Sequence, residues 1–253
     1  MDSTLPVDAM PAPAAEPSMS PFARAVAVFT RPGEAWSGLR EHAQWWYPLL
    51  IVLVVAATTA GILHNRAIVP MVEDQWQDAV ANGQMTPEQE AKIEAFFSGP
   101  TGLTISIVQT ALFVALIPFV VAAVVWFGVA FVLGKKFGYR LALEVAAWAG
   151  LVTIPAQALT TVIAWSMETM RGVHAGFGLL LPDTDTPSRL HTFFGFVLDA
   201  FGPLSIWYVA ILIIGAATLS GAPKKSTAWV IGGLYLALSI FLAAVGALVT
   251  PTS

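Results

Sequence analysis

The chain has 253 residues, of which 57% are hydrophobic and only 11% are charged, and its formal net charge is −4. A soluble domain carries roughly 25% charged residues, so the composition indicates an integral membrane protein. The negative charge argues against a nucleic-acid partner, and the absence of cysteine excludes disulfides, thiolate metal sites and a cysteine nucleophile.

The first 20 residues are rich in Pro, Ala and Ser and have no apolar periodicity, which predicts a disordered tail over 1–20 and a membrane domain over 21–250. The tail lacks the basic start and apolar run of a secretory signal. The first span is therefore expected to act as the insertion signal.

Aromatic and apolar residues stand beside arginines just ahead of the first span, a pattern typical of interfacial amphipathic helices. We expect these segments to lie on the inner leaflet, either as an anchor for the first span or as a docking surface for a protein partner. The residues are Phe22, Val26 and Phe29 at helical spacing, then Trp36, Trp45 and Trp46.

Five apolar runs follow, and they predict an all-α polytopic protein, a bundle of five transmembrane helices with interfacial amphipathic helices. The longest run has no Asp, Glu, Lys, Arg or His, and as a helix it would be about 46 Å long against a hydrocarbon core of about 30 Å. The predicted spans are 47–63, 103–133, 141–167, 204–219 and 227–249.

The connection after the first span is acidic and is predicted to form an extracytoplasmic helical hairpin over 70–98 that lies over the membrane face. Pro70 is expected to open its first helix and Gly83 to close it. Thr86 and Gln89 then have the spacing of a capping box at the start of its second helix.

The connection before the fourth span is predicted to contain a helix over 187–201 that lies on the outer membrane interface, with Thr186 as its cap and Pro187 at its first position. Fifteen residues are too short to cross the membrane. The predicted apolar face consists of Leu190, Phe193, Phe194, Val197 and Leu198.

The distribution of basic residues predicts the orientation of the spans, because short cytoplasmic loops are rich in Lys and Arg. Eight of the twelve lie before the first span or in the two tight turns, which predicts a cytoplasmic N-terminus and an extracytoplasmic C-terminus. They are Arg24, Arg31, Arg40, Lys135, Lys136, Arg140, Lys224 and Lys225.

Three polar residues are candidate functional groups. Glu144, near the start of the third span, is expected to pair with Arg140 or a lysine of the turn, or else to relay a proton or ion. Asp199 is expected to bind backbone amides at the start of the fourth span, or else a substrate. Gln157 is expected to pack between helices.

Prolines in the second and third spans offer an alternative, because broken helices line the midplane sites of transporters. Pro118 and Pro155, with Gln157, would form such a site. Otherwise these residues serve helix packing.

Two more features concern partners. Ser239, Ala243 and Ala247 have the four-residue spacing of close helix packing, inside the bundle or against another copy of the chain.

The four histidines are scattered, so no metal site is expected; His174 and His191 with Asp183 or Asp185 are the one conceivable set. No catalytic motif and no cofactor motif is present, so no cofactor is expected.

Three segments resemble the bacterial branch of the Yip family, the Ypt/Rab-interacting membrane proteins. They are Phe29 to Trp36 (FTRPGEAW), Phe137 to Leu143 (FGYRLAL) leading to Pro155, and Pro203 to Trp207 (PLSIW) leading through Gly215 to Lys224 and Lys225.

The resemblance implies five spans with a cytoplasmic N-terminus and, for the bacterial branch, a place in the inner membrane. Eukaryotic members bind small GTPases and shape membranes in vesicle trafficking. In the eukaryotic members an Asp-Leu-Tyr-Gly-Pro motif precedes the spans. Residues 199–203 (DAFGP) are similar to it but precede the fourth span, so no GTPase-binding role is carried over.

The leading functional hypothesis is a non-enzymatic inner-membrane protein that organises membrane or recruits partners through its cytoplasmic amphipathic segment. The alternative is a small transporter or channel subunit with a midplane site around Pro155, Gln157 and Glu144.

Overall fold

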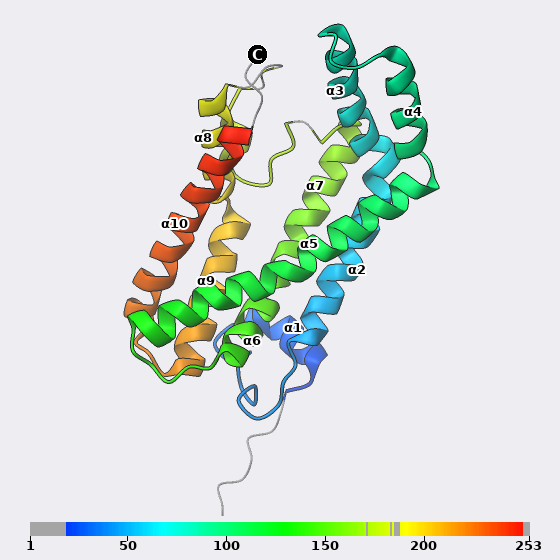
Figure 1. The fold of residues 1–253 in the computed structure, drawn as a ribbon. Helices are drawn as coiled ribbons and strands as arrows, with labels where there is room; N and C mark the ends of the chain where they lie inside the picture. Colours follow the sequence, from blue (N-terminus) through cyan, green and yellow to red (C-terminus); the bar gives the residue numbers. More distant parts are fainter. Residues whose placement is uncertain (1–18, 171, 183, 185–187, 250–253) are drawn as a thin grey trace, which may run out of the picture.

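A computed structural model describes residues 19–170, 172–182, 184 and 188–249, and within them the chain is helical (Figure 1). The predicted tail over 1–20 lies almost entirely outside the described residues. The helices are α1 Pro21–Thr30, α2 Trp46–Leu63, α3 Val69–Ala81, α4 Pro87–Phe97, α5 Pro100–Trp126, α6 Tyr139–Gly150, α7 Thr153–Met167, α8 Arg189–Asp199, α9 Pro203–Ser220 and α10 Lys224–Val249, with π-helical turns η1 His64–Ile68 and η2 Phe127–Val132 and a 3-10 turn η3 Phe177–Leu180.

Within the described residues, five helical stretches are long and apolar enough to cross a membrane, which confirms the predicted fold class of an all-α multi-pass membrane protein. Four of them contain a predicted apolar run in full, and the second contains the run 103–133 except for its last residue. They cover Trp46–Ala81, Pro100–Val132, Tyr139–Met167, Pro203–Ser220 and Lys224–Val249.

The first stretch differs from the prediction, because the helix does not stop at the end of the predicted span 47–63. It continues into α3 through the π-helical turn η1. Pro70 is the second residue of α3, two positions after the end of η1. Proline lacks an N–H and its ring clashes with the carbonyl four residues earlier, so a widened turn lets the helix continue past it.

The α3–α4 hairpin has the predicted end signals and extends the line of α2 beyond the rest of the bundle (Figure 1). Thr86 and Gln89 form the capping box, and Gly83 adopts a φ of 70° just after the end of α3. The hairpin is joined to the bundle at His64, whose Nε2 lies 2.9 Å from the carbonyl oxygen of Phe97.

The third span is divided into α6 and α7, which the sequence predicted as one helix with a central proline. The break falls at Leu151 and Val152, so Pro155 occupies the third position of α7. A proline there costs no hydrogen bond, because the first amides of a helix have no intrahelical partner.

The α8 helix begins later than predicted, with Ser188 rather than Thr186 as its cap; Thr186 and Pro187 lie outside the described residues. It packs along α10, where a Cβ added to Gly246 would lie 2.7 Å from the ring of Phe196. Ala243 and Ala247 are buried in the chain itself, so these two predicted packing positions serve the bundle. The position of α8 at a membrane surface stays a prediction.

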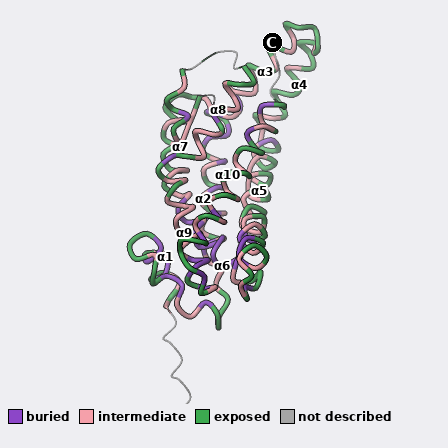
Figure 2. Tube along the Cα trace, turned by 90° about the vertical axis from the view of Figure 1, so that its left-hand side faces the viewer, coloured by how far each residue is buried: buried purple, intermediate pink, exposed green. Residues whose placement is uncertain are grey.

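The α6 helix is the centre of the core. Every residue from Ala142 to Ala149 is buried, and α6 packs against α2, α5 and α9. Buried residues gather around it at the lower end of the molecule (Figure 2). We call this end, with the turns that connect its helices, the α6 end.

Candidate functional site

The first candidate site is the junction where the N-terminal segment, residues 19–45, packs on the α6 end. Its anchor is Arg24, on the inner side of α1, whose side chain is completely buried. The guanidinium donates to the carbonyl oxygens of Ala35, Ser37 (2.8 Å) and Met19 (3.5 Å), and its Nε donates to Oε1 of Gln44 at 3.0 Å. One side chain therefore holds α1 to the turns that follow it.

Gln44 connects this segment to the bundle. Its backbone amide donates to Oε1 of Glu144 at 2.7 Å. The guanidinium of Arg24 also stands 5.6 Å from the ring centre of Trp148, one turn after Glu144 on α6. Burial lowers the pKa of Arg24, and the negative charge of Glu144 opposes that shift.

Glu144 is completely buried as the sixth residue of α6. The expected pairing with Arg140 is present, at 3.8 Å. Its other carboxylate oxygen, Oε2, has no hydrogen-bond partner among the described residues. A structural role for Glu144, against a role as a relay, stays a prediction.

Arg140 holds the same segment from the bundle side. Its two terminal nitrogens donate to the carbonyl oxygens of Leu39 at 3.0 Å and Arg40 at 2.6 Å. Arg40 in turn donates to the carbonyl oxygen of Leu219, at the end of α9, at 2.6 Å. Residues far apart in the chain are thus joined through side chain to backbone bonds.

The prediction that Trp36 lies at a membrane or partner interface is wrong. Its side chain is 2% exposed, and a Cβ added to Gly215 of α9 would lie 2.7 Å from its ring. Trp45 is half-buried, edge-on to Phe119 at 5.9 Å, and Trp46 is half-exposed. The three tryptophans therefore lie in different environments, from the core to the surface of the bundle.

The outer side of α1 carries the predicted apolar face. Phe22 is 73% exposed, Val26 46% and Phe29 42%, whereas Ala27 and Val28 on the other side are buried. Because Arg24 fixes the inner side, the helix presents these three side chains outward.

A second candidate site is a cavity of about 160 Å³ between the spans, where α2, α5, α6, α7 and α9 meet. Gln157 and Pro118 line it, together with Tyr208 and mostly apolar side chains. Nε2 of Gln157 donates to Oγ1 of Thr153 at 3.3 Å. Pro155 is exposed on α7 and Glu144 does not line the cavity, so the structure separates these two from Gln157.

A third candidate site surrounds Asp199, at the end of α8. Its carboxylate lies 2.7 Å from Nδ1 of His174 and accepts the amide of Gly176 at 3.2 Å. The expectation that it binds amides of the fourth span is therefore wrong; only its carbonyl oxygen meets that span, where it accepts from Ser205 at 3.1 Å. His174, His191 and Asp199 line a cavity of about 310 Å³.

The described residues contain no group of three or more His, Asp or Glu able to hold a metal ion. Asp183 and Asp185, the acids of the conceivable set with His174 and His191, lie outside the described residues.

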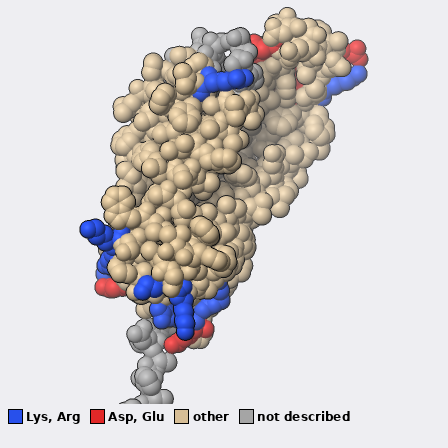
Figure 3. All heavy atoms as spheres, turned by 60° about the vertical axis from the view of Figure 1, so that its left-hand side comes forward, with Lys and Arg blue, Asp and Glu red and all other residues tan. Residues whose placement is uncertain are grey.

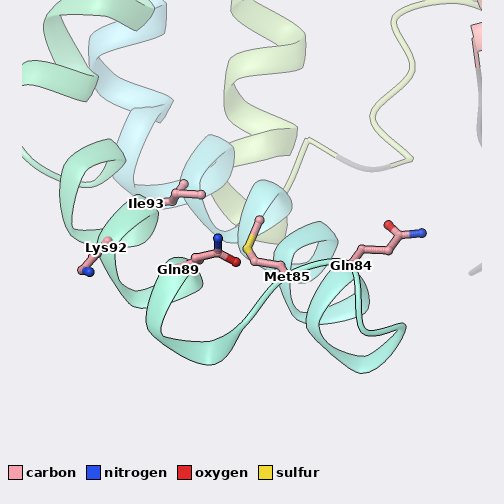
Figure 4. Close-up of a pocket in the computed structure, with 5 residues that line it drawn as sticks. All are labelled: Gln84, Met85, Gln89, Lys92 and Ile93. Carbon is pink, nitrogen blue, oxygen red and sulfur yellow. The ribbon is translucent and has the colours of Figure 1, made fainter.

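A hollow of about 360 Å³ lies on the α3–α4 hairpin (Figure 4). It is lined by Gln84, Met85, Gln89, Lys92 and Ile93, with Lys92 and Gln84 at opposite ends pointing apart. Lys92 pairs with Glu88 at 2.8 Å. The lining therefore brings no reactive groups together.

Sequence reasoning missed the buried state of Arg24 and the roles of Gln44 and His174. An arginine ahead of a span is usually a surface charge, so nothing in the pattern marked Arg24 as buried. The glycines near His174 were a usable signal, since a Cβ at Gly176, Gly178 or Gly202 would lie within 2.7 Å of another atom of this tight loop.

Comparison with known proteins gives one result. The Yip1 domain family matches residues 26–246, which is nearly the whole chain; the match begins after Phe22 and Arg24 and ends within α10. No curated protein and no solved structure matches the chain. The chain therefore belongs to the Yip1 domain family.

Proposed function

We propose that the protein is a non-enzymatic component of the bacterial inner membrane that organises the membrane, or recruits partner proteins, through its N-terminal segment on the cytoplasmic side. One observation carries the proposal. The α1 helix is anchored by the buried Arg24 and exposes Phe22, Val26 and Phe29 on its outer side.

The size of α1 suits it to lie in a membrane surface. Its 10 residues give a helix of about 15 Å, which cannot cross a core of about 30 Å. Each large apolar side chain that leaves water contributes about 1.5–3 kcal/mol when fully buried, so this face favours the outer part of a leaflet.

Because α1 is attached to the five spans, its insertion would change the area of one leaflet of the bilayer. A helix that enters one leaflet next to a fixed bundle adds area to that leaflet alone. The basic residues of the α6 end, gathered at the lower end in Figure 3, agree with a cytoplasmic leaflet for α1. The same exposed face offers a protein partner a helical docking surface.

The test is reconstitution of the purified full chain into vesicles at increasing protein content. We expect the wild type to produce smaller or tubular vesicles, and the triple variant Phe22→Ser, Val26→Ser, Phe29→Ser to leave vesicle shape unchanged, as observed by cryo-electron microscopy. The matched control is Ile93→Ser with Phe96→Ser, two exposed apolar residues of α4.

Unchanged vesicles with the wild type would contradict the membrane-organising part of the proposal. A triple variant as active as the wild type would show that α1 is not responsible.

A second candidate function, a small transporter or channel subunit, is favoured by the central cavity with Gln157 and Pro118 in its lining. It predicts flux of an ion or small solute across reconstituted vesicles and loss of that flux in Gln157→Leu. Pro155→Ala, a change on the exposed side of α7, is the matched control. Absence of flux over a broad panel of solutes would remove this candidate.

A further inference from the structure

Four lysines form a free cationic cluster at the α6 end. Lys135 and Lys136 lie in the turn between η2 and α6, and Lys224 and Lys225 begin α10. Among the described residues, none of the four has an ion pair or a side-chain hydrogen bond. The arginines of the same end bind protein oxygen atoms instead: Arg24, Arg31, Arg40 and Arg140.

The two lysine pairs belong to neighbouring elements, because η2 packs against α10. A Cβ added to Gly128 of η2 would lie 2.9 Å from Leu234 and 3.0 Å from Val230, so the two backbones approach closely. The amide of Lys135 donates to the carbonyl oxygen of Val129 at 3.1 Å, which holds its turn against η2. The packing of η2 on α10 therefore keeps both lysine pairs at the same end of these two elements.

Exposed aromatic side chains lie on the same two elements, η2 and α10, one turn further from this end. Trp229 is 78% exposed, four residues after Lys225, and so lies about 6 Å further along α10 on the same face. Phe131 is 64% exposed, four residues before Lys135. Lysines at the end of a span, with exposed aromatic residues one turn deeper, match the polar and apolar layers of a membrane surface.

We infer that the lysine cluster binds the phosphate groups of anionic phospholipids, with Trp229 and Phe131 against the glycerol and upper acyl region. A lysine ammonium binds a phosphate as a compact charge and needs no fixed geometry. The negative surface of an anionic leaflet attracts basic groups next to a span. This site is separate from α1 and goes beyond the proposed function.

The experiment measures the unfolding temperature of the purified full chain in neutral detergent with added dioleoylphosphatidylglycerol or dioleoylphosphatidylcholine. We expect the anionic lipid to raise the unfolding temperature more than the zwitterionic lipid, and this difference to shrink as NaCl is added. In the variant with all four lysines changed to Gln, we expect the apparent affinity for the anionic lipid to fall at least about tenfold.

Of the two matched controls, one keeps the positive charge of the cluster and the other removes a lysine at a distant position. The four Lys→Arg substitutions together, and separately Lys92→Gln on the α3–α4 hairpin, should keep the response of the wild type. An undiminished response in the Gln variant would overturn the inference, and so would a wild type that does not distinguish the two lipids. If inorganic phosphate alone reproduced the shift, the cluster would be a site for free anions and the lipid assignment would be wrong.

Discussion

Arg24 shows how a single residue can fix a segment that has little core of its own. The turns over 31–45 contain few regular backbone hydrogen bonds, and Arg24 binds carbonyl oxygens within them. Removing the guanidinium leaves buried acceptors unpaired, and each such group costs about 1–3 kcal/mol. The Arg24 side chain therefore contributes to the stability of the segment, together with Arg140 and the packing of Trp36 on α9.

The first prediction is that Arg24→Met releases residues 21–45 from the bundle while the spans stay folded. Lysine cannot replace the arginine, because one ammonium cannot reach the same set of acceptors. Hydrogen exchange measured by mass spectrometry should show loss of protection over 21–45 only.

The control for this prediction is Arg31→Met, which breaks the exposed pair of Arg31 and Glu34 at 3.0 Å. Exposed ion pairs contribute about 0–1 kcal/mol, so this variant should exchange like the wild type. Equal protection in both variants would mean that Arg24 does not hold the segment.

The second prediction concerns the packing of Trp36 on α9. Gly215→Ala places a methyl group 2.7 Å from the indole ring, and overpacking of this kind costs about 1–3 kcal/mol. We expect a lower unfolding temperature and faster exchange over 31–45. Gly232→Ala is the control, because nothing lies within 4 Å of its added Cβ; a similar drop in both variants would contradict the account.

At the scale of elements, the five spans and the ends of several helices could be predicted from the sequence. In a chain with so few charges, apolar runs of this length indicate transmembrane helices. The signals of Thr86, Gln89 and Gly83 act through local backbone geometry. These features depend on residues close together in the chain.

The continuous α2–α3 helix and the break between α6 and α7 could not be predicted in the same way. Proline disturbs a helix wherever it stands, but the sequence does not say whether the chain widens a turn, as at Pro70, or ends one helix early, as before Pro155. Packing against neighbouring helices decides between these outcomes.

The third prediction concerns the loop that His174 and Asp199 join to the end of α8. The two side chains are 2.7 Å apart and only partly exposed, so we expect them to be energetically coupled. A double-mutant cycle of His174→Phe and Asp199→Asn should give a coupling energy of about 0.5–3 kcal/mol. Additive effects on the free energy of unfolding would show that this contact does not stabilise the loop.

At the scale of the whole molecule, sequence reasoning recovered the class of protein but only part of the candidate site. Phe22, Val26 and Phe29 were identified as an outer face, whereas Trp36 was placed outside although it is buried. In a membrane protein both the core and the surrounding lipid are apolar. An aromatic residue near a span therefore does not reveal which of the two it contacts.

The fourth prediction is the orientation of the bundle. The unequal distribution of Lys and Arg predicts a cytoplasmic N-terminus and, with five spans, an extracytoplasmic C-terminus. A reporter that is active only in the cytoplasm should be silent when fused after Ser253. An active fusion would mean that the orientation is inverted or that the number of crossings is not five.

The central claim is that the bundle holds α1 so that its outer face enters the lipid, and the absence of native cysteine allows a direct test. Single cysteines at Phe22, Val26 and Phe29, labelled with an environment-sensitive fluorophore in vesicles, should report an apolar environment accessible to a lipid-soluble quencher. A cysteine at Glu34, exposed beyond α1, should report water. If all four positions report water in vesicles of the full chain, α1 does not lie in the membrane and the account is contradicted.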